Sequence, residues 1–374
     1  MAMTEVKLMG GGQAVGRVES VAAERLLVPL GQARGGSGAT QLELILVSLQ
    51  LKDGPRGVGF TYTLGGGGAA VLALLRQELL APLVDLELRD FDHVLRQYWA
   101  NTHRLGAGVS ALAIAAIDIA VWDARAWEAG VPLYRLLGAE RSRIEVYGSG
   151  RATNTMTTEE LIEGARQYLA EGCRAIKLRV GARPPAEDLA RVRAVREAVG
   201  DDVRIMVDCN ERLDLPTALW LGEHLGELGV YWLEEPLPSY YLEQYAELSR
   251  RLPVAIAAGE HLQTRYAFAE YLRHGAASVL MPDAPIVGGI TEWLRVAAVA
   301  EAFGVPVSPH FLPELHIHCA LAAPNCREVE HFPLLDEVIE NPLPIQDGGM
   351  SPWERPGHGM IFSEERLARF RAEN

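Results

Sequence analysis

Short apolar runs alternate with stretches of helical periodicity through the second half of the chain. The apolar runs have the length of buried strands and cover residues 143–147, 174–180, 203–207, 230–233, 254–258, 278–281, 305–308 and 327–331. Helical patterns separate them: one opens with the capping-box pair Thr157 and Glu160 and stops at Gly172, and another covers residues 186–199. Eight strands in βαβα order predict a parallel barrel, as opposed to a sandwich.

The first 135 residues have a different pattern. Residues 41–52 alternate as a long strand, and residues 72–80 and 109–129 have helical periodicity. Two stretches rich in small residues, 31–40 and 63–68, suit either mobile loops that close over a barrel mouth or plain surface connections, and we expect the second loop to cover residues 60–68. We predict an α+β capping domain over residues 1–135, a barrel over 136–335, and a C-terminal segment, 336–374, that packs on the capping domain and completes it.

Three acidic residues end successive apolar runs and are evenly spaced, 26 residues apart: Asp208, Glu234 and Glu260. The interval is one strand-plus-helix unit, and the strand ends of a parallel barrel converge on the face where active sites are built. Three converging carboxylates repel one another unless a cation lies between them, and an all-oxygen ligand set favours Mg²⁺. The spacing therefore predicts a Mg²⁺ site at the barrel mouth.

Other polar residues are predicted to face the same mouth. Lys177 and Arg179 alternate along one strand, so both point to one face, and charge inside a barrel is costly unless it is paired. If the strand lay on the surface, two exposed cations would be unremarkable and would not indicate a functional site. Asp283 and His310 follow neighbouring strands, where the carboxylate could fix the tautomer of the imidazole and raise its basicity. We interpret this pair as a candidate acid–base dyad.

Several further residues have both a structural and a functional interpretation. Glu314 could be an acid at a helix N-terminus or part of the site. His261 directly follows Glu260 and could line the pocket, and Arg151 could bind a substrate carboxylate. Glu235 points away from Glu234 in a pleated strand and is expected to form a structural ion pair.

The charge and the amino-acid composition of the chain limit the kinds of partner and the cellular compartment that we expect. The net charge of −14 argues against nucleic acid and anionic membranes. The four cysteines contain no Cys-x-x-Cys pair, so we expect reduced, buried thiols and no disulfide framework. The start of the sequence lacks a basic segment followed by an apolar core, and no apolar run is long enough to span a bilayer. These features predict a cytoplasmic protein.

Together these residues resemble the enolase superfamily and, within it, the mandelate racemase group (mandelate racemase/muconate lactonizing enzyme-like), which includes many acid-sugar dehydratases. The likeness spans nearly the whole chain. The matching segments are residues 117–123, 132–138, 175–181, 206–210, 232–236, 258–260, 281–284, 288–291 and 303–310 with Glu314.

The resemblance implies an α/β fold, a (β/α)₇β modified TIM barrel capped by an α+β domain whose loops supply specificity. It implies that Asp208, Glu234 and Glu260 bind Mg²⁺, that Asp283 and His310 form the catalytic dyad, and that Glu314 hydrogen-bonds the substrate carboxylate as it becomes an enediolate. The resemblance also suggests a small-molecule carboxylate substrate and a homo-oligomer, commonly an octamer. The residues that we expect to contact the substrate are Asn210, Arg151, His261 and Tyr62.

Lys177 and Arg179 match the Lys-x-Lys pair of the group, but an arginine stands where the second lysine abstracts the α-proton. Because the pKa of an arginine lies far above neutral pH, an arginine base would cost about 8–9 kcal/mol near neutral pH. Arg179 is better interpreted as an electrostatic clamp. We therefore predict dehydration of an aldonate or aldarate to a 2-keto-3-deoxy acid, in which His310 takes the α-proton and then protonates the departing β-hydroxyl.

Three alternatives stay open. The first is racemisation or epimerisation of a 2-hydroxy acid, with Lys177 as the second base. The second is cycloisomerisation of an acid-sugar lactone. The third, from a different class, is a non-catalytic paralogue that serves as a binding module.

Overall fold

A computed structural model of the chain describes residues 16–30, 38–340 and 342–372. The capping domain is built on an antiparallel sheet of three strands in sequence order, β1 (Val18–Pro29), β2 (Gln41–Leu51) and β3 (Arg56–Leu64). Its helices are α1 (Gly68–Leu74), α2 (Phe91–Thr102), α3 (Gly108–Glu128) and α4 (Leu133–Leu136), with a single π turn at Leu75–Leu79 and 3₁₀ turns at Ala81–Leu83, Leu88–Asp90 and His103–Leu105.

The sequence pattern predicted only part of this domain. The strand at 41–52 and the helix at 109–129 are confirmed as β2 and α3, and the helix at 72–80 is confirmed as α1 with the π turn that continues it. Strands β1 and β3 and helix α2 were not predicted. The expectation of a loop at 60–68 is wrong for residues 60–64, which pair with β2, so only Gly65, Gly66 and Gly67 form the turn, all with positive φ. Residues 31–37 of the other expected loop lie outside the described residues.

The capping sheet is buried on both faces. Leu44 and Leu46 of β2, with Tyr62 of β3, pack into the same core as the barrel, whereas Ile45 and Val47 pack against the helices of the capping domain. Because side chains alternate along a strand, this two-sided burial explains the nearly continuous apolar run in β2. It also fixes which residues of β3 face the barrel.

The barrel strands are parallel and follow one another around the ring. They are β4 (Ile144–Gly148), β5 (Ala175–Arg179), β6 (Arg204–Asp208), β7 (Trp232–Glu234), β8 (Ala255–Ala258), β9 (Val279–Leu280) and β10 (Glu328–His331). The predicted strand at 305–308 is reduced to Val307, which bridges Leu280 on one side and Cys326 on the other and so closes the ring. The (β/α)₇β barrel is confirmed.

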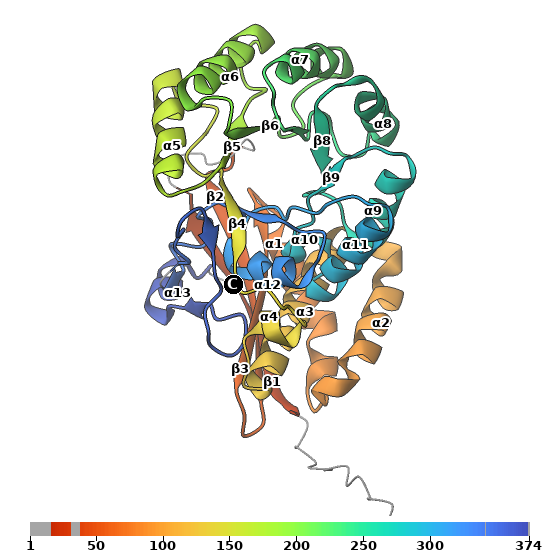
Figure 1. Cartoon of the computed structure of the whole chain (residues 1–374). Helices are drawn as coiled ribbons and strands as arrows, with labels where there is room; N and C mark the ends of the chain where they lie inside the picture. The colour runs from red at the N-terminus through yellow and green to blue at the C-terminus, as the bar shows by residue number, and fades with distance from the viewer. Residues whose placement is uncertain (1–15, 31–37, 341, 373–374) are drawn as a thin grey trace, which may run out of the picture.

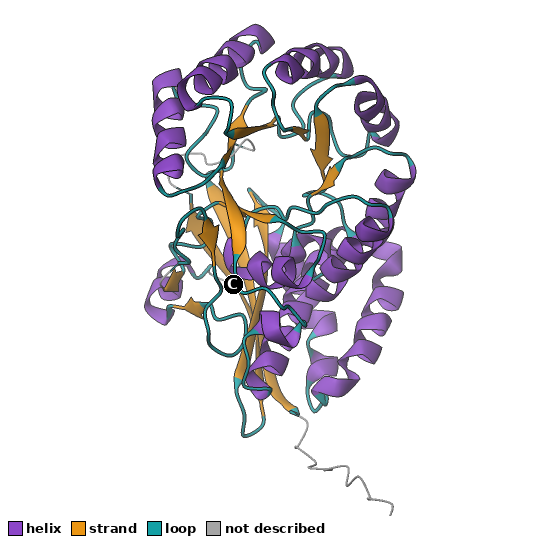
Figure 2. Cartoon of the chain, in the orientation of Figure 1, coloured by secondary structure: helices purple, strands orange, loops and turns teal. Residues whose placement is uncertain are grey.

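Helices cover the outer side of the barrel strands, as Figures 1 and 2 show. They are α5 (Thr158–Ala170), α6 (Pro185–Val199), α7 (Leu215–Glu227), α8 (Leu242–Arg251), α9 (Thr264–Arg273), α10 (Ala284–Val287), α11 (Ile290–Ala302) and α12 (Pro313–Ala322). The predicted capping box of Thr157 and Glu160 is present at the start of α5. A separate apolar cluster lies inside the barrel, below the polar residues of the mouth. It includes Tyr147, Met206, Trp232 and Met281.

The C-terminal segment contains β11 (Ile339–Glu340), β12 (Gly349–Met350), β13 (Ile361–Phe362) and α13 (Glu364–Phe370). It touches both parts of the protein, because β12 pairs with β4 and Arg371 forms a bridge with Leu26 of β1. The predicted boundaries at residues 135 and 335 stay predictions. All four cysteines are free and buried. Among the described residues, the helices are too short or too polar to cross a membrane.

Candidate active site

The three evenly spaced carboxylates meet at the mouth of the barrel. Asp208 and Glu234 are the last residues of β6 and β7 and are aligned in register, and Glu260 lies two residues beyond β8. One oxygen from each carboxylate lies within 4.8 Å of the others, and all three side chains are buried. The chain leaves β6 and β7 through the left-handed residues Asn210 (φ 45°) and Glu235 (φ 38°), which turn it sharply just beyond the clustered carboxylates.

Two buried cations face these carboxylates, as the alternation along β5 predicted. The Nζ atom of Lys177 is 2.6 Å from Oε1 of Glu234 and 3.9 Å from Oδ2 of Asp208. The guanidinium of Arg179 donates to Oδ2 of Asp208. Both cations are fully desolvated, at 0% and 1% exposure, so the pairing is what makes their burial tolerable.

A fourth carboxylate, Glu330 on β10, joins the cluster and was not predicted. Its Oε1 is 2.9 Å from Nζ of Lys177 and 3.8 Å from Arg179, and its Oε2 accepts the backbone N–H of Phe311. Burial alone would raise the pKa of Glu330, but the charges of Lys177 and Arg179 hold it at about 2. The alternation within β10, which turns Val329 outward and Glu330 inward, is the signal that would have identified it.

The expectation that Glu314 faces the site is not supported. Glu314 lies in the first turn of α12, and its Oε2 has no hydrogen-bond partner among the residues that the structure describes. In the part of the chain that the structure describes, no hydrogen bond or ion pair joins Glu314 to the cluster, and burial raises its pKa to about 8. The acid that faces the cations is Glu330.

The charge of the cluster suits a divalent cation. Four carboxylates face two cations, an excess of two negative charges. Burial raises the pKa of Glu234 to about 8 and that of Glu260 well above its ordinary value, so these carboxylates are poorly compensated. Within the described residues, Oε2 of Glu260 also has no hydrogen-bond partner. The all-oxygen donor set and the uncompensated charge fit Mg²⁺.

The predicted dyad stands beside this cluster. Nδ1 of His310 is 2.9 Å from Oδ2 of Asp283, and Nε2 is 3.4 Å from Oε1 of Glu260. Burial lowers the pKa of His310 well below its ordinary value, which favours the neutral imidazole. With Nδ1–H donating to Asp283, Nε2 presents a lone pair at the carboxylate cluster, as a general base requires.

Two protein families match most of the chain. Residues 17–138 match the family described as mandelate racemase/muconate lactonizing enzyme, N-terminal domain, and residues 160–366 match the enolase C-terminal domain-like family. The chain belongs to the mandelate racemase group of the enolase superfamily.

Members of the mandelate racemase group resemble the chain over most of its length. L-talarate/galactarate dehydratase of Salmonella typhimurium is 33% identical over 92% of this chain and 88% of its own. The 3,6-anhydro-alpha-L-galactonate cycloisomerase of Streptomyces coelicolor is 34% identical over 87% of this chain and 91% of its own. The structure of L-talarate dehydratase from Polaromonas sp. JS666, complexed with Mg and L-glucarate, has a TM-score of 0.88 and 34% identity, and the match covers 96% and 98% of the two chains.

The four expected substrate contacts of this mandelate racemase group member lie in different surroundings. Asn210 donates its backbone N–H to Asp208, and its side-chain Oδ1 has no partner among the described residues. The side chain of His261 is half exposed. The buried part of the imidazole disfavours its protonated form, but the carboxylate of Glu235, 3.0 Å away, outweighs this effect and raises the pKa of His261 to about 10. This contact is the ion pair expected of Glu235. Tyr62 is buried against Asp283.

Arg151 is not brought to the cluster. Its guanidinium pairs with Glu171 at 2.8 Å and lies over the ring of Tyr168, in the layer between β4 and α5. We therefore leave Arg151 out of the functional site.

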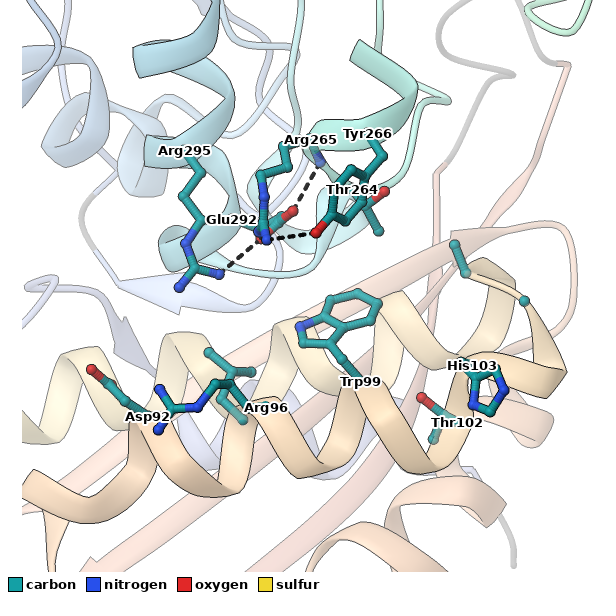
Figure 3. Close-up of a pocket in the computed structure, with 13 residues that line it drawn as sticks. Asp92, Arg96, Trp99, Thr102, His103, Thr264, Arg265, Tyr266, Glu292 and Arg295 are labelled. Atoms are coloured by element: carbon teal, nitrogen blue, oxygen red, sulfur yellow. Dashed lines mark hydrogen bonds and ion pairs between the residues drawn. The ribbon is translucent and has the colours of Figure 1, made fainter. Parts of the chain in front are cut away.

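A separate cleft of about 410 Å³ lies between the capping domain and the barrel helices. Figure 3 shows Asp92, Arg96 and Trp99 of α2 on one wall, facing Arg265 and Glu292 of α9 and α11 on the other. Glu292 is buried and forms ion pairs with both Arg265 and Arg295. The pair with Arg265 joins α9 to α11. None of the predicted site residues lines this cleft.

Proposed function

We propose that the protein is a Mg²⁺-dependent acid-sugar dehydratase that converts an aldonate or aldarate to a 2-keto-3-deoxy acid. The observation that carries this proposal is the position of His310: its Nδ1 is held by Asp283, while its Nε2 faces the carboxylate cluster from 3.4 Å. One well-prepared base beside a cation site suits removal of the proton next to a carboxylate.

Asp208, Glu234 and Glu260 are the residues that would hold Mg²⁺. A bound Mg²⁺ would supply Lewis-acid stabilisation of the negative charge that develops on the substrate carboxylate when the α-proton leaves. Oδ1 of Asn210, which has no hydrogen-bond partner in the described ranges of the chain, is a candidate contact for a substrate hydroxyl.

His310 is assigned both proton transfers. Nε2 of His310 takes the α-proton, and the electrons of the C–H bond pass to the substrate carboxylate. The imidazolium then protonates the β-hydroxyl, and as the C–O bond breaks these electrons form the double bond between the α- and β-carbons. Water leaves, and the resulting enol tautomerises to the 2-keto-3-deoxy acid. A single base on one side of the α-carbon is enough for this sequence.

Racemisation needs a second base, and Lys177 and Arg179 are poorly suited to act as that base. Burial opposes their charge, but Glu234 and Glu330 raise the pKa of Lys177, and Asp208 and Glu330 raise that of Arg179, each above its ordinary value. We assign both the role of holding the carboxylates and the substrate charge. We assign to Glu330, which contacts both cations, the role that the family resemblance implied for Glu314.

The relatives support this reaction class, and one of them favours a second candidate. The L-talarate/galactarate and arabinonate dehydratases, 33% and 30% identical, act on acid sugars by name. The 3,6-anhydro-alpha-L-galactonate cycloisomerase is 34% identical, so isomerisation of a cyclic acid sugar is the second candidate.

A panel of aldonates, aldarates and their lactones or anhydro forms, incubated with Mg²⁺, tests the proposal. We expect a 2-keto-3-deoxy product and loss of one water from an open-chain acid sugar, with no turnover in EDTA. A product of unchanged mass from a cyclic substrate would identify the cycloisomerase. Deuterium incorporation from D₂O with inversion and no keto product would identify a racemase and overturn the dehydratase.

Assembly and location stay proposals as well. We propose a homo-oligomer, octameric by the family resemblance, and a cytoplasmic location. Light scattering of the purified protein tests the assembly, and a monomer would contradict it.

A further inference from the structure

The hydroxyl of Tyr62 contacts the acid–base dyad from the capping domain. It donates to Oδ2 of Asp283 at 2.7 Å and lies 3.5 Å from Nδ1 of His310. The side chain is 3% exposed and belongs to the face of β3 that packs into the barrel core. A residue of one domain therefore reaches the reactive pair of the other.

The carboxylate of Asp283 has few other partners. Its Oδ1 has no hydrogen bond in the described part of the chain, and His316, whose Nε2 is 3.9 Å away, cannot supply one. Nε2 of His316 already accepts the backbone N–H of Ala284 at 2.8 Å, and its Nδ1 lies 2.8 Å from the carbonyl of Phe311. His316 is thus a neutral imidazole with its proton on Nδ1. The side-chain hydrogen bonds of Asp283 therefore end on Oδ2, which His310 and Tyr62 share, while the backbone N–H of Ile286 also acts on this carboxylate.

Tyr62 is poorly placed to act on a substrate directly. A phenol has one proton to donate, and Asp283 accepts it. Burial, and then the nearby Asp283, raise the pKa of Tyr62 well above its ordinary value, so the hydroxyl does not ionise to a base. What the hydroxyl can do is fix the carboxylate behind the imidazole.

We propose that Tyr62 is a positioning residue that holds Asp283 in the rotamer that orients His310; the kinetic consequence rests on the proposed dehydratase function. Without the hydroxyl, one neutral donor, the imidazole N–H, remains on Oδ2 and the carboxylate can turn about its side-chain bond. His310 then spends less time with Nε2 aimed at the α-proton. Loss of a hydrogen bond to a charged acceptor predicts a fall in kcat of about 10- to 100-fold.

The neighbouring Thr61 offers a matched control. Its buried hydroxyl donates to the carbonyl of Pro285 at 2.8 Å, so it also joins β3 to the segment that follows β9, two residues after Asp283. Within the described residues, no hydrogen bond joins Thr61 to Asp283 or His310. Tyr62→Phe and Thr61→Val each remove one buried interdomain hydrogen bond. They differ in whether that bond ends on the catalytic carboxylate.

The experiment measures kcat, KM and the α-deuterium isotope effect on kcat for both variants, with melting temperatures as a check on folding. For Tyr62→Phe we expect the stated fall in kcat, a KM within about twofold of wild type, and a larger isotope effect because proton abstraction becomes more rate-limiting. For Thr61→Val we expect wild-type kcat and isotope effect. If both variants lose kcat equally and the isotope effect is unchanged, Tyr62 is only a structural link between the domains. If only KM changes in Tyr62→Phe, Tyr62 is a substrate contact. Either result overturns the proposal.

Crystal structures of wild type and Tyr62→Phe separate this inference from the proposed function. If no acid sugar is turned over by the wild type, the dehydratase fails, but the geometry remains testable. We expect a rotated Asp283 carboxylate and a displaced His310 ring in the variant. A dyad that superposes on the wild type would overturn the positioning role.

Discussion

The buried carboxyl of Glu314 should make the protein less stable as the pH rises, and the substitution Glu314→Gln should remove that effect. Glu314 is 3% exposed, and burial raises its pKa from an ordinary 4.5 to about 8. Between these two values the folded protein keeps a proton that the unfolded chain has lost. Because the unfolded state binds fewer protons there, the free energy of unfolding falls as the pH rises through this window.

The size of the effect follows from the pKa shift. At about pH 7 the unfolded chain gains roughly 3 kcal/mol by ionising a carboxyl that the folded protein holds neutral. Between about pH 5 and about pH 8, wild type should therefore lose roughly 3 kcal/mol more stability than Glu314→Gln. Urea denaturation followed by tryptophan fluorescence at the two pH values, at equal protein concentration, measures this difference.

A matched control and an activity assay sharpen the test. Glu301 is exposed on α11, so Glu301→Gln should leave the pH dependence of wild type unchanged. Glu314→Gln should also retain wild-type turnover, because no hydrogen bond or ion pair of the described residues joins Glu314 to the carboxylate cluster. Parallel stability curves for wild type and Glu314→Gln would show that the carboxyl is hydrated in solution and would refute the reasoning.

Four further outcomes are expected. His310→Asn should lower kcat by about 100- to 10,000-fold with an unchanged melting temperature, since it removes a general base; wild-type turnover would remove the role of the dyad. Glu330→Gln should lower stability by about 3 kcal/mol in urea denaturation and abolish most activity, because it leaves Lys177 and Arg179 with one carboxylate fewer. Mg²⁺ at about 100 times its Kd should stabilise wild type by about 2.7 kcal/mol in a thermal melt but leave Glu260→Gln unaffected. Gly59→Ala should cost about 1–3 kcal/mol, since its Cβ would lie 2.2 Å from the carbonyl of Ala116; a wild-type melting temperature would contradict this.

The sequence was most informative where the barrel repeats itself. Each strand-plus-helix unit ends at the same height, so Asp208, Glu234 and Glu260 could be assigned to one mouth without knowledge of side-chain contacts. The period of two along β5 likewise placed Lys177 and Arg179 together. These inferences needed only local periodicity and the geometry of a parallel barrel.

Contacts that depend on the meeting of distant segments could not be obtained in this way. The bond from Tyr62 to Asp283 requires β3 to dock on the barrel with one particular face, which the pattern of residues 60–68 does not reveal. Arg151 has the right place along the chain, but its long side chain turns back to Glu171 on the helix side. Glu330 could be predicted from local pattern alone, because its strand was predicted and the alternation along that strand gives its inward direction.

The two-sided burial of the capping sheet restricts how its substrate range could be redesigned. Because alternate residues of β3 face different cores, an insertion or deletion of one residue between Arg56 and Tyr62 would turn the wrong side chain toward Asp283. Directed evolution of β3 should therefore vary its side chains and the length of the glycine turn at 65–67, because these glycines are not paired with β2. Libraries that alter the length of β3 itself should be dominated by variants that fold and bind but turn over slowly.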